Sequence, residues 1–476
     1  MNSFLFRFRQ KFSKIGATIS GIRQKRMYFD YASITPVDER VIKHISKISK
    51  EYPANPNSLY KEGVLAFKEL EKSREKVAKH LDVHADEIVF TSGGTESNNL
   101  AIQGVLKAYK MGRVEKVGAD ANGGGANPQK PHIISSEIEH PAVRELLLQY
   151  QEAGECDVTF IPVGVDGIVD LKEFKKELRP ETILVTIMYV NNEIGTIQPI
   201  SEISKIVRHY KKAKLEKVIE ENRKPMTYSS IYPLVHTDAC QAVLFCPMRA
   251  INLGVDMITL DSAKFYGPRG VGALYIKRSV TQSKVIAPIQ IGGSQEFELR
   301  AGTQNVAGIS GLAYALDLAV AEKEKESTRL GTLRDFVVEE LKKLTLNGGN
   351  EVGENRKEAS EKTPKIIFNG TYGKDSYGND LRVPNNINIC ILGIDAEYAV
   401  LRLDVRGVCV SSVTSCRSKN EDSTSYVVEA LHKNVNGETE ATFDCGKSSL
   451  RITLGRFTTE RKVKKLVKVL TEVLGK

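Results

Sequence analysis

The chain alternates two patterns of hydrophobic residues from Tyr28 onward. Short runs rich in β-branched residues are typical of strands buried on both faces, and apolar residues that recur every three or four positions are typical of helices. Strands that alternate with helices predict an α/β fold, in which crossover helices cover a sheet. The predicted strands are residues 87–91, 132–136, 183–189, 234–238, 257–260 and 272–276.

Polar segments interrupt this alternation at residues 114–131, 211–228 and 346–382, and a further polar stretch covers 433–447. Long polar segments of this kind are normally solvated loops, so we expect surface insertions there. The chain closes with apolar residues at helical spacing from Val463 onward, which predicts a terminal helix that packs one face.

Residues 1–26 form a distinct basic leader, with seven lysines and arginines and no acidic residue. Its apolar residues also recur at helical spacing, which predicts an amphipathic helix. Such a segment resembles an organellar transit peptide, suits a helix that lies on an anionic membrane surface, and also suits a helix packed on its own protein. These three interpretations stay open.

Composition narrows the class of protein. The chain has 476 residues, of which 41% are hydrophobic and 27% charged, enough for a large core in one big or two ordinary domains. The net charge is +9, and the leader supplies most of it, so the charge does not indicate nucleic-acid binding. No apolar stretch reaches the roughly 18 residues of a membrane span.

Cysteine usage points to a reducing compartment. The seven cysteines are scattered, and none forms a Cys-x-x-Cys pair or stands near histidines at zinc-finger spacing. We therefore expect thiols, not disulfides, and no metal site.

Three strand ends carry candidate chemistry. The strand at 87–91 runs into Ser-Gly-Gly-Thr and then a helical pattern, a turn whose backbone N–H groups can hold a phosphate. A second strand ends in Asp238, and Lys264 follows a third. A lysine can form a Schiff base, a carboxylate can keep a pyridine nitrogen protonated, and the turn can anchor a phosphate. Together they indicate pyridoxal 5'-phosphate.

Over nearly all of residues 27–475 the chain resembles the cysteine desulfurases of the class V aminotransferase family, which are fold-type I pyridoxal-phosphate enzymes. Eight motifs carry the resemblance and occur in the family's order. They lie at residues 28–32, 90–99, 138–143, 190–198, 236–241, 264–275, 300–305 and 450–459.

The resemblance implies an aspartate-aminotransferase-like α/β fold, with a mainly parallel seven-stranded sheet and a smaller α+β domain. The expected division is a leader at 1–26, an N-terminal segment at 27–45 that joins the small domain, a large cofactor-binding domain at 46–304 and a small domain at 305–476. A homodimer is also implied, because Thr303 would reach the phosphate in the other subunit's site.

Carried over position by position, the resemblance gives the cofactor a set of ligands. Lys264 would hold it covalently, Asp238 would face its ring nitrogen, and Gln241 would donate to its phenolic oxygen. His140 would stack on the ring and relay protons. The remaining cofactor contacts would come from Gly94, Thr95, Asn192, Ser262 and Thr303.

The substrate implied by the resemblance is L-cysteine. Asn192 would contact it and Arg451 would bind its carboxylate through paired hydrogen bonds. Cys416, in the stretch Val-Ser-Ser-Val-Thr-Ser-Cys, would be the nucleophile that takes the substrate's sulfur as a persulfide. With Lys264 and His140 it completes the predicted catalytic set.

The chain departs from the family just before Lys264, where the usual Ser-x-His-Lys reads Asp261-Ser262-Ala263-Lys264. The change removes two donors and brings in a carboxylate, which is expected to weaken binding of a phosphate unless Ser262 or Arg300 compensates. Tyr60, where the family commonly has histidine, and Val413 and Ser415 in the cysteine loop are further differences.

The predicted function is therefore a cysteine desulfurase that supplies sulfur for iron-sulfur cluster assembly or tRNA thiolation through an acceptor or scaffold protein. Alternatives are a selenocysteine or cysteine lyase of the same fold, and a catalytically weak homologue that serves as a sulfur-transfer partner. We expect a cytoplasmic protein, or a mitochondrial one if the leader is cleaved.

Overall fold

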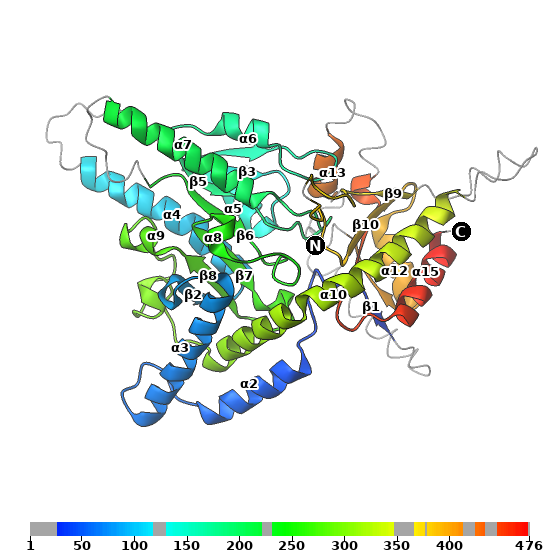
Figure 1. Cartoon of the computed structure of the whole chain (residues 1–476), viewed down its shortest axis with the longest axis horizontal. Coiled ribbons are helices and arrows are strands. Elements are labelled where there is room, and N and C mark those ends of the chain that lie inside the picture. The colour runs from blue at the N-terminus through cyan, green and yellow to red at the C-terminus, as the bar shows by residue number, and fades with distance from the viewer. Residues whose placement is uncertain are drawn as a thin grey trace, which may run out of the picture.

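The computed structural model describes residues 26–117, 130–220, 231–346, 366–376, 378–412, 424–433 and 445–474. Two lobes lie side by side, and one long helix runs diagonally across both (Figure 1). We call the lobe built on a seven-stranded sheet the large domain, and the lobe built on a four-stranded sheet the small domain.

The large-domain sheet has the strand order β2-β8-β7-β6-β5-β3-β4. Only β8 runs antiparallel to its two neighbours, and the other pairs are parallel. The predicted mainly parallel sheet is confirmed. Its strands are β2 (Ile88–Thr91), β3 (His132–Ser136), β4 (Asp157–Ile161), β5 (Thr182–Thr186), β6 (Leu234–Asp238), β7 (Met257–Asp261) and β8 (Gly272–Ile276).

The sequence pattern located the buried strands closely but missed β4. Strand β4 lies at the sheet edge and its residues are mostly half-buried, so its sequence alternates polar and apolar residues instead of forming an apolar run. Strand β5 ends at Thr186, three residues earlier than predicted, and the chain then turns into the loop that lines the site.

Successive residues of each strand point to opposite faces of the sheet, and helices cover both faces. Ile88 and Phe90 pack in one buried cluster with α3 (Lys61–Leu81), α7 (Ile200–Glu220) and α10 (Val306–Leu346). Val89 packs in a second cluster with α4 (Gly94–Val117) and α5 (Pro141–Glu152).

Two buried histidines tie the parallel strands together. His132 on β3 contacts the hydroxyls of Thr182 and Thr159, at 2.9 Å each. His236 on β6 contacts those of Thr186, at 2.8 Å, and Thr259, at 3.0 Å. Burial lowers the pKa of each imidazole to about 4, so both rings are neutral near pH 7.

The small domain is built on an antiparallel sheet of order β12-β13-β10-β9. Its core is packed by α12, α15 and the second half of α10, and the N-terminal residues Met27 and Phe29 join it. The elements are β9 (Ile366–Phe368), β10 (Asn386–Ile391), α12 (Ala396–Val405), β12 (Ser411–Ser412), β13 (Ser449–Thr453) and α15 (Glu460–Leu474), and a short parallel pair joins β1 (Met27–Tyr28) to β11 (Val408–Cys409). Helix α15 is the predicted terminal helix.

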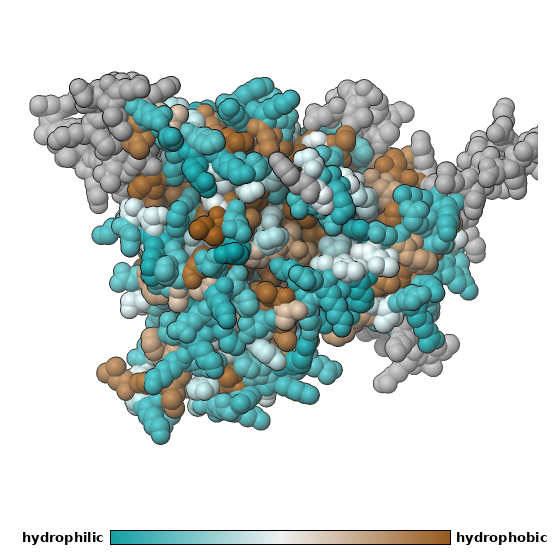
Figure 2. Space-filling view, viewed as in Figure 1, coloured by the Kyte–Doolittle hydropathy of each residue, from teal (hydrophilic) through white to brown (hydrophobic). Residues whose placement is uncertain are grey.

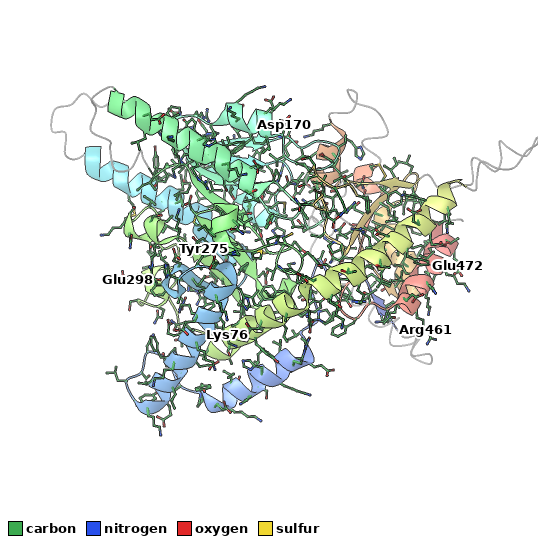
Figure 3. The ribbon with its side chains drawn as sticks, viewed as in Figure 1. Lys76, Asp170, Tyr275, Glu298, Arg461 and Glu472 are labelled. Carbon is green, nitrogen blue, oxygen red and sulfur yellow. A yellow bond between two sulfur atoms is a disulfide. The ribbon has the colours of Figure 1, made fainter. Side chains whose placement is uncertain are left out.

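Helix α10 connects the two domains. Its residues Ile309 to Ala319 pack in the large-domain core, and Leu330 to Leu341 pack in the small-domain core. On the large-domain side, α3 carries Lys76, which is labelled in Figure 3. Its Nζ atom lies 2.9 Å from a carboxylate oxygen of Asp317 on α10. The predicted boundary at 304/305 falls just before a helix that belongs to both cores, so the division stays a prediction.

A helix and a strand replace parts of the predicted loops. Helix α7 continues through Glu220, so the first half of the segment at 211–228 is helical, and the exposed Lys212 and Glu216 extend its solvent-facing side. The segment at 346–382 likewise contains strand β9 and the buried Arg382. The remaining α-helices of the described residues are α2 (Glu39–Glu51), α6 (Leu171–Glu177), α8 (Ala250–Leu253), α9 (Arg278–Gln282) and α13 (Tyr426–His432).

The expectation of thiols alone is wrong for one pair. Cys390 on β10 and Cys445 form a disulfide, with their Cα atoms 5.2 Å apart. Because 55 residues separate the two cysteines along the chain, their spacing carried no signal. Cys156, Cys240, Cys246 and Cys409 are free.

The surface in view is mostly hydrophilic, with smaller hydrophobic patches scattered over it (Figure 2). None of the helices in the described ranges combines the length and apolar character that crossing a membrane would require.

Candidate active site

A cavity of about 260 Å³ lies where the carboxyl ends of the large-domain strands meet the small domain. In open α/β sheets this crevice is the usual ligand site. Eight predicted site residues line the cavity, and they are Gly94, Thr95, His140, Asn192, Asp238, Gln241, Lys264 and Arg451.

The turn after β2 forms one end of the cavity. Gly93 adopts a φ of +151°, which favours glycine, and a Cβ atom on Gly94 would lie only 2.7 Å from the Sγ atom of Cys240. Helix α4 begins at Gly94, so its first backbone N–H groups have no partner within the helix. Glycines at this point allow a ligand to approach those N–H groups closely.

Asp238, at the end of β6, is held through both of its carboxylate oxygens. Oδ2 accepts a hydrogen bond from Asn98 Nδ2 at 2.7 Å, and Oδ1 accepts one from the backbone N–H of Cys240 at 3.0 Å. Asn98 was not among the predicted residues, although it lies within the motif at 90–99. It comes from α4 and fixes the direction of the carboxylate.

Lys264 follows β7 in a short 3-10 turn, η2 (Ser262–Lys264). Its Nζ atom donates to the carbonyl oxygens of Ser33, at 2.7 Å, and Ala32, at 3.2 Å. Gln241 Nε2 donates to the same carbonyl of Ala32 at 2.8 Å. The N-terminal segment therefore lies against Lys264 and Gln241, two of the residues that were predicted to hold a cofactor.

His140 caps the N-terminus of α5. Its Nδ1 atom accepts a hydrogen bond from the backbone N–H of Ala142 at 3.1 Å, so in the neutral ring the proton sits on Nε2. Burial lowers the pKa of His140, which keeps the ring neutral near pH 7.

The neighbouring residue Glu139 was not predicted. It is fully buried, accepts from Ser136 Oγ at 2.6 Å and from the backbone N–H of Met188 at 2.9 Å, and so joins the ends of β3 and β5. Burial raises the pKa of this carboxyl to about 8. An acidic residue next to a motif histidine was the only signal for it in the sequence.

Arg451 enters the cavity from β13 of the small domain and is 6% exposed. Its Nη2 atom donates to Asp30 Oδ1 at 2.8 Å and to Ser33 Oγ at 2.5 Å, and Nη1 donates to the carbonyl oxygen of Asn192 at 2.9 Å. Its buried Nε atom has no hydrogen-bond partner. The guanidinium thus lines the cavity and is neutralised by Asp30, and its predicted contact with a substrate carboxylate stays a prediction.

Three predicted residues lie elsewhere. Ser262 is fully buried, does not line the cavity, and has its Oγ atom only 2.0 Å from the position of a Cβ on Gly267. Thr303 is exposed and does not line the cavity of its own chain. Cys416 lies outside the described residues. Their assigned roles stay predictions.

The small domain adds residues that sequence reasoning missed. Ser411, Ser412 and Ser425 line the cavity, and Ser425 Oγ donates to Glu193 Oε2 at 2.6 Å. Ser425 also caps α13, since its side chain accepts from the backbone N–H of Val428. Ser411 and Ser412 belong to the stretch that leads to Cys416, which was their signal in the sequence, whereas Ser425 lies in none of the eight motifs.

A family model described as "Aminotransferase class-V" matches residues 27–215 and 232–466. The chain belongs to the class-V aminotransferase family. The family predicted from the eight motifs is confirmed.

Relatives of this class-V aminotransferase cover nearly the whole chain. A protein of Dictyoglomus turgidum named "Cysteine desulfurase IscS" is 36% identical over 453 residues, 95% of each chain. The human protein named "Selenocysteine lyase" is 32% identical over 453 residues, 95% of this chain and 92% of the human one. A solved structure of a NifS-like protein is 30% identical, with a TM-score of 0.73, over 94% of this chain and 99% of that one.

Proposed function

We propose that this class-V aminotransferase is a cysteine desulfurase, which converts L-cysteine to L-alanine and keeps the sulfur as a persulfide on Cys416. One observation carries the proposal. A single cavity gathers Lys264, Asp238 and His140 from the large domain with Arg451 from the small domain. The names of the relatives, cysteine desulfurase and selenocysteine lyase, support this substrate class.

The residues present fit pyridoxal 5'-phosphate as the cofactor. The glycine turn before α4 suits a phosphate, Lys264 offers the amine, and Asp238, held by Asn98 and the Cys240 N–H, offers a carboxylate for a ring nitrogen. The buried Oδ1 atom of Asn98 has no protein partner, so a polar group of a ligand can satisfy it. When bound, this cofactor supplies an electron sink for bonds at the amino-acid carbon.

The protein's own groups would position the substrate and move its protons. Arg451 would exchange part of its contact with Asp30 and Ser33 for the substrate carboxylate. Neutral His140, held through Nδ1, would present Nε2 to the cavity as the atom that holds or moves a proton. The Lys264 amine, which donates to two carbonyls, would serve as the cofactor ligand and as a base after release.

The sulfur transfer balances with one cysteine thiol of the enzyme. The carbon-sulfur bond of L-cysteine breaks, and the thiolate of Cys416 bonds to the departing sulfur as a persulfide. The electron pair stays on the substrate carbon, which takes a proton and leaves as L-alanine. No external oxidant is required, because the substrate carbon is reduced as the sulfur is oxidised.

The test is an absorbance spectrum of the purified protein with pyridoxal phosphate, before and after L-cysteine, together with an alanine assay. We expect a visible band that changes with L-cysteine, alanine as product, and one persulfide per chain. Cys416→Ala should keep the band and lose alanine turnover, whereas Cys156→Ala, a buried thiol outside the cavity, should retain both. Full turnover in Cys416→Ala would refute the assigned nucleophile.

A second candidate, a selenocysteine lyase, rests on the human relative of that name. Comparison of kcat/KM for L-selenocysteine and L-cysteine decides between the two, since the lyase predicts little turnover of L-cysteine. The third candidate, a weak homologue that acts as a sulfur-transfer partner, predicts no visible band with added cofactor.

We further propose that the protein works as a homodimer, with Thr303 of each chain completing the other chain's site, and that it passes sulfur to an acceptor or scaffold protein. Thr303 is exposed, as this role requires. A cytoplasmic location, or a mitochondrial one after cleavage of residues 1–26, remains a proposal. Sedimentation of the purified protein tests the dimer.

A further inference from the structure

Asp261, the last residue of β7, brings a carboxylate to the glycine turn of the cavity. Its Oδ1 atom accepts from the backbone N–H of Ala263 at 3.0 Å, which fixes the side chain. Its Oδ2 atom lies 3.5 Å from the Cβ position of Gly94 and 3.8 Å from that of Gly93. Oδ2 therefore lies beside the turn whose backbone N–H groups would hold a phosphate.

The charges around Asp261 do not neutralise a second anion there. Among the residues that the structure describes, the cavity is lined by one lysine, Lys264, which donates to two backbone carbonyls, and one arginine, Arg451, which is paired with Asp30. Asp238 and Glu193 add further carboxylates to the lining, and His140 is neutral.

Within the described residues, the elements that face Asp261 supply no free cation either. On α4 beyond the turn, Glu96 is paired with Arg300 at 2.9 Å, so that guanidinium is already engaged. Cys240, two residues after the end of β6, presents a buried thiol whose pKa is raised above its ordinary value by burial. The opposite strand, β8, contributes Gly272.

We propose that Asp261 and the cofactor's phosphate share one proton, so that the protein takes up a proton from solvent when it binds pyridoxal phosphate. The inference rests on the cofactor of the proposed function. In water, the proton of an aspartic acid and the second proton of a phosphate monoester both dissociate below pH 7. Two such anions in contact do not both stay fully ionised.

The shared proton changes how this chain holds its cofactor. It lies in a hydrogen bond between Oδ2 and a phosphate oxygen, and no other bond forms or breaks. Because that proton comes from solvent, affinity for the cofactor decreases as the pH rises. Asp261 thus makes cofactor retention dependent on pH, where a neutral hydroxyl at the same position would not.

The test is the dissociation constant of the cofactor-free protein for pyridoxal phosphate between about pH 6.5 and 8.5, measured for the wild type and Asp261→Asn. Asparagine keeps an oxygen for the Ala263 N–H and offers an amide donor to the phosphate. We expect the ratio of the wild-type dissociation constant to that of Asp261→Asn to grow about tenfold per pH unit as the pH rises. Bond formation at Lys264 is common to both proteins and cancels in the ratio.

Pyridoxal, which lacks the phosphate, is the matched control ligand. The ratio of the wild-type and variant dissociation constants for pyridoxal should not change with pH. In addition, the phosphorus NMR signal of the cofactor bound to the wild type should remain that of the monoanion up to about pH 8. This measurement needs no variant. For the binding measurements, Asp261→Ser is a second variant beside Asp261→Asn.

Equal pH dependence in wild type and variant would overturn the proposal, as would a phosphorus signal that reaches the dianion near pH 6. A pH-dependent ratio with pyridoxal would also overturn it, because Asp261 would then act on the ring or on Lys264. If neither protein binds pyridoxal phosphate, the cofactor of the proposed function fails together with this inference.

Discussion

The two sheets contribute to the cavity in different ways. In the large domain the site residues follow the ends of strands, as Asp238 ends β6 and Lys264 comes three residues after β7. In the small domain Arg451 stands in the middle of β13, between the core residues Leu450 and Ile452. A parallel sheet brings its strand ends to one edge, whereas an antiparallel sheet offers the alternate residues on one face.

The polar face of the small sheet meets the large domain through side chains. Asn388 and Ser411 are the partners of Arg451 in the strand register. Asn388 and Asn386 both donate to the carbonyl oxygen of Glu193, at 3.1 Å each. A cation on this face is buried between the domains and must be paired, which explains its contact with Asp30.

The strongest test of the large-domain half is Lys264→Ala. We expect alanine formation from L-cysteine to fall by at least about 10³-fold, because the amine that binds the cofactor and accepts protons is lost. The visible band of the bound cofactor should disappear as well, and both are followed by absorbance and an alanine assay. Lys175→Ala, on the exposed side of α6, is the control and should behave as the wild type.

The matching test of the small-domain half is Arg451→Ala compared with Arg451→Lys. Loss of the guanidinium should lower kcat/KM for L-cysteine by about 100-fold, mainly through KM, and lysine should recover part of that loss by keeping the charge. The dissociation constant of the cofactor should change little. Steady-state kinetics that show an unchanged KM in Arg451→Ala would contradict the division of labour between the two sheets.

A smaller effect concerns the stability of the large-domain sheet, in which the buried His236 makes the unfolding free energy depend on pH. The folded-state pKa of His236 is about 4, below its unfolded value, so its contribution is complete above about pH 6.5 and is lost as the pH falls toward 4. For this one residue the loss is about 3 kcal/mol of unfolding free energy. Urea unfolding at pH 7 and pH 5 measures the part that is lost above pH 5, about 2 kcal/mol, and we expect a smaller difference between the two pH values in His236→Gln.

That prediction concerns the parallel sheet in particular, because His236 bridges β5, β6 and β7 through Thr186 and Thr259. His132 has the same arrangement and adds to the wild-type slope. Identical pH dependence in His236→Gln and the wild type would mean that the imidazole titrates alike in folded and unfolded chains.

Much of the large domain could be predicted from the sequence, because its strands are short apolar runs and its motifs sit at the strand ends. The bounds of β3, β6 and β8 agree with the prediction. The edge strand β4 and the helical continuation of α7 were missed, since a half-exposed strand and a charged helix lack an apolar run.

The sequence by itself determined the alternation of strands and helices and the residue types at the strand ends, since both follow from local periodicity and from motifs within one segment. Only the tertiary structure decided which groups meet: Asn98 with Asp238, Arg451 with Asp30, and Asp261 with the turn at Gly94. Asp30 and Arg451 are 421 positions apart, and no local pattern records a contact at that separation. Such contacts form when the two cores pack, because buried charges and amides then take the partners that the fold brings within reach.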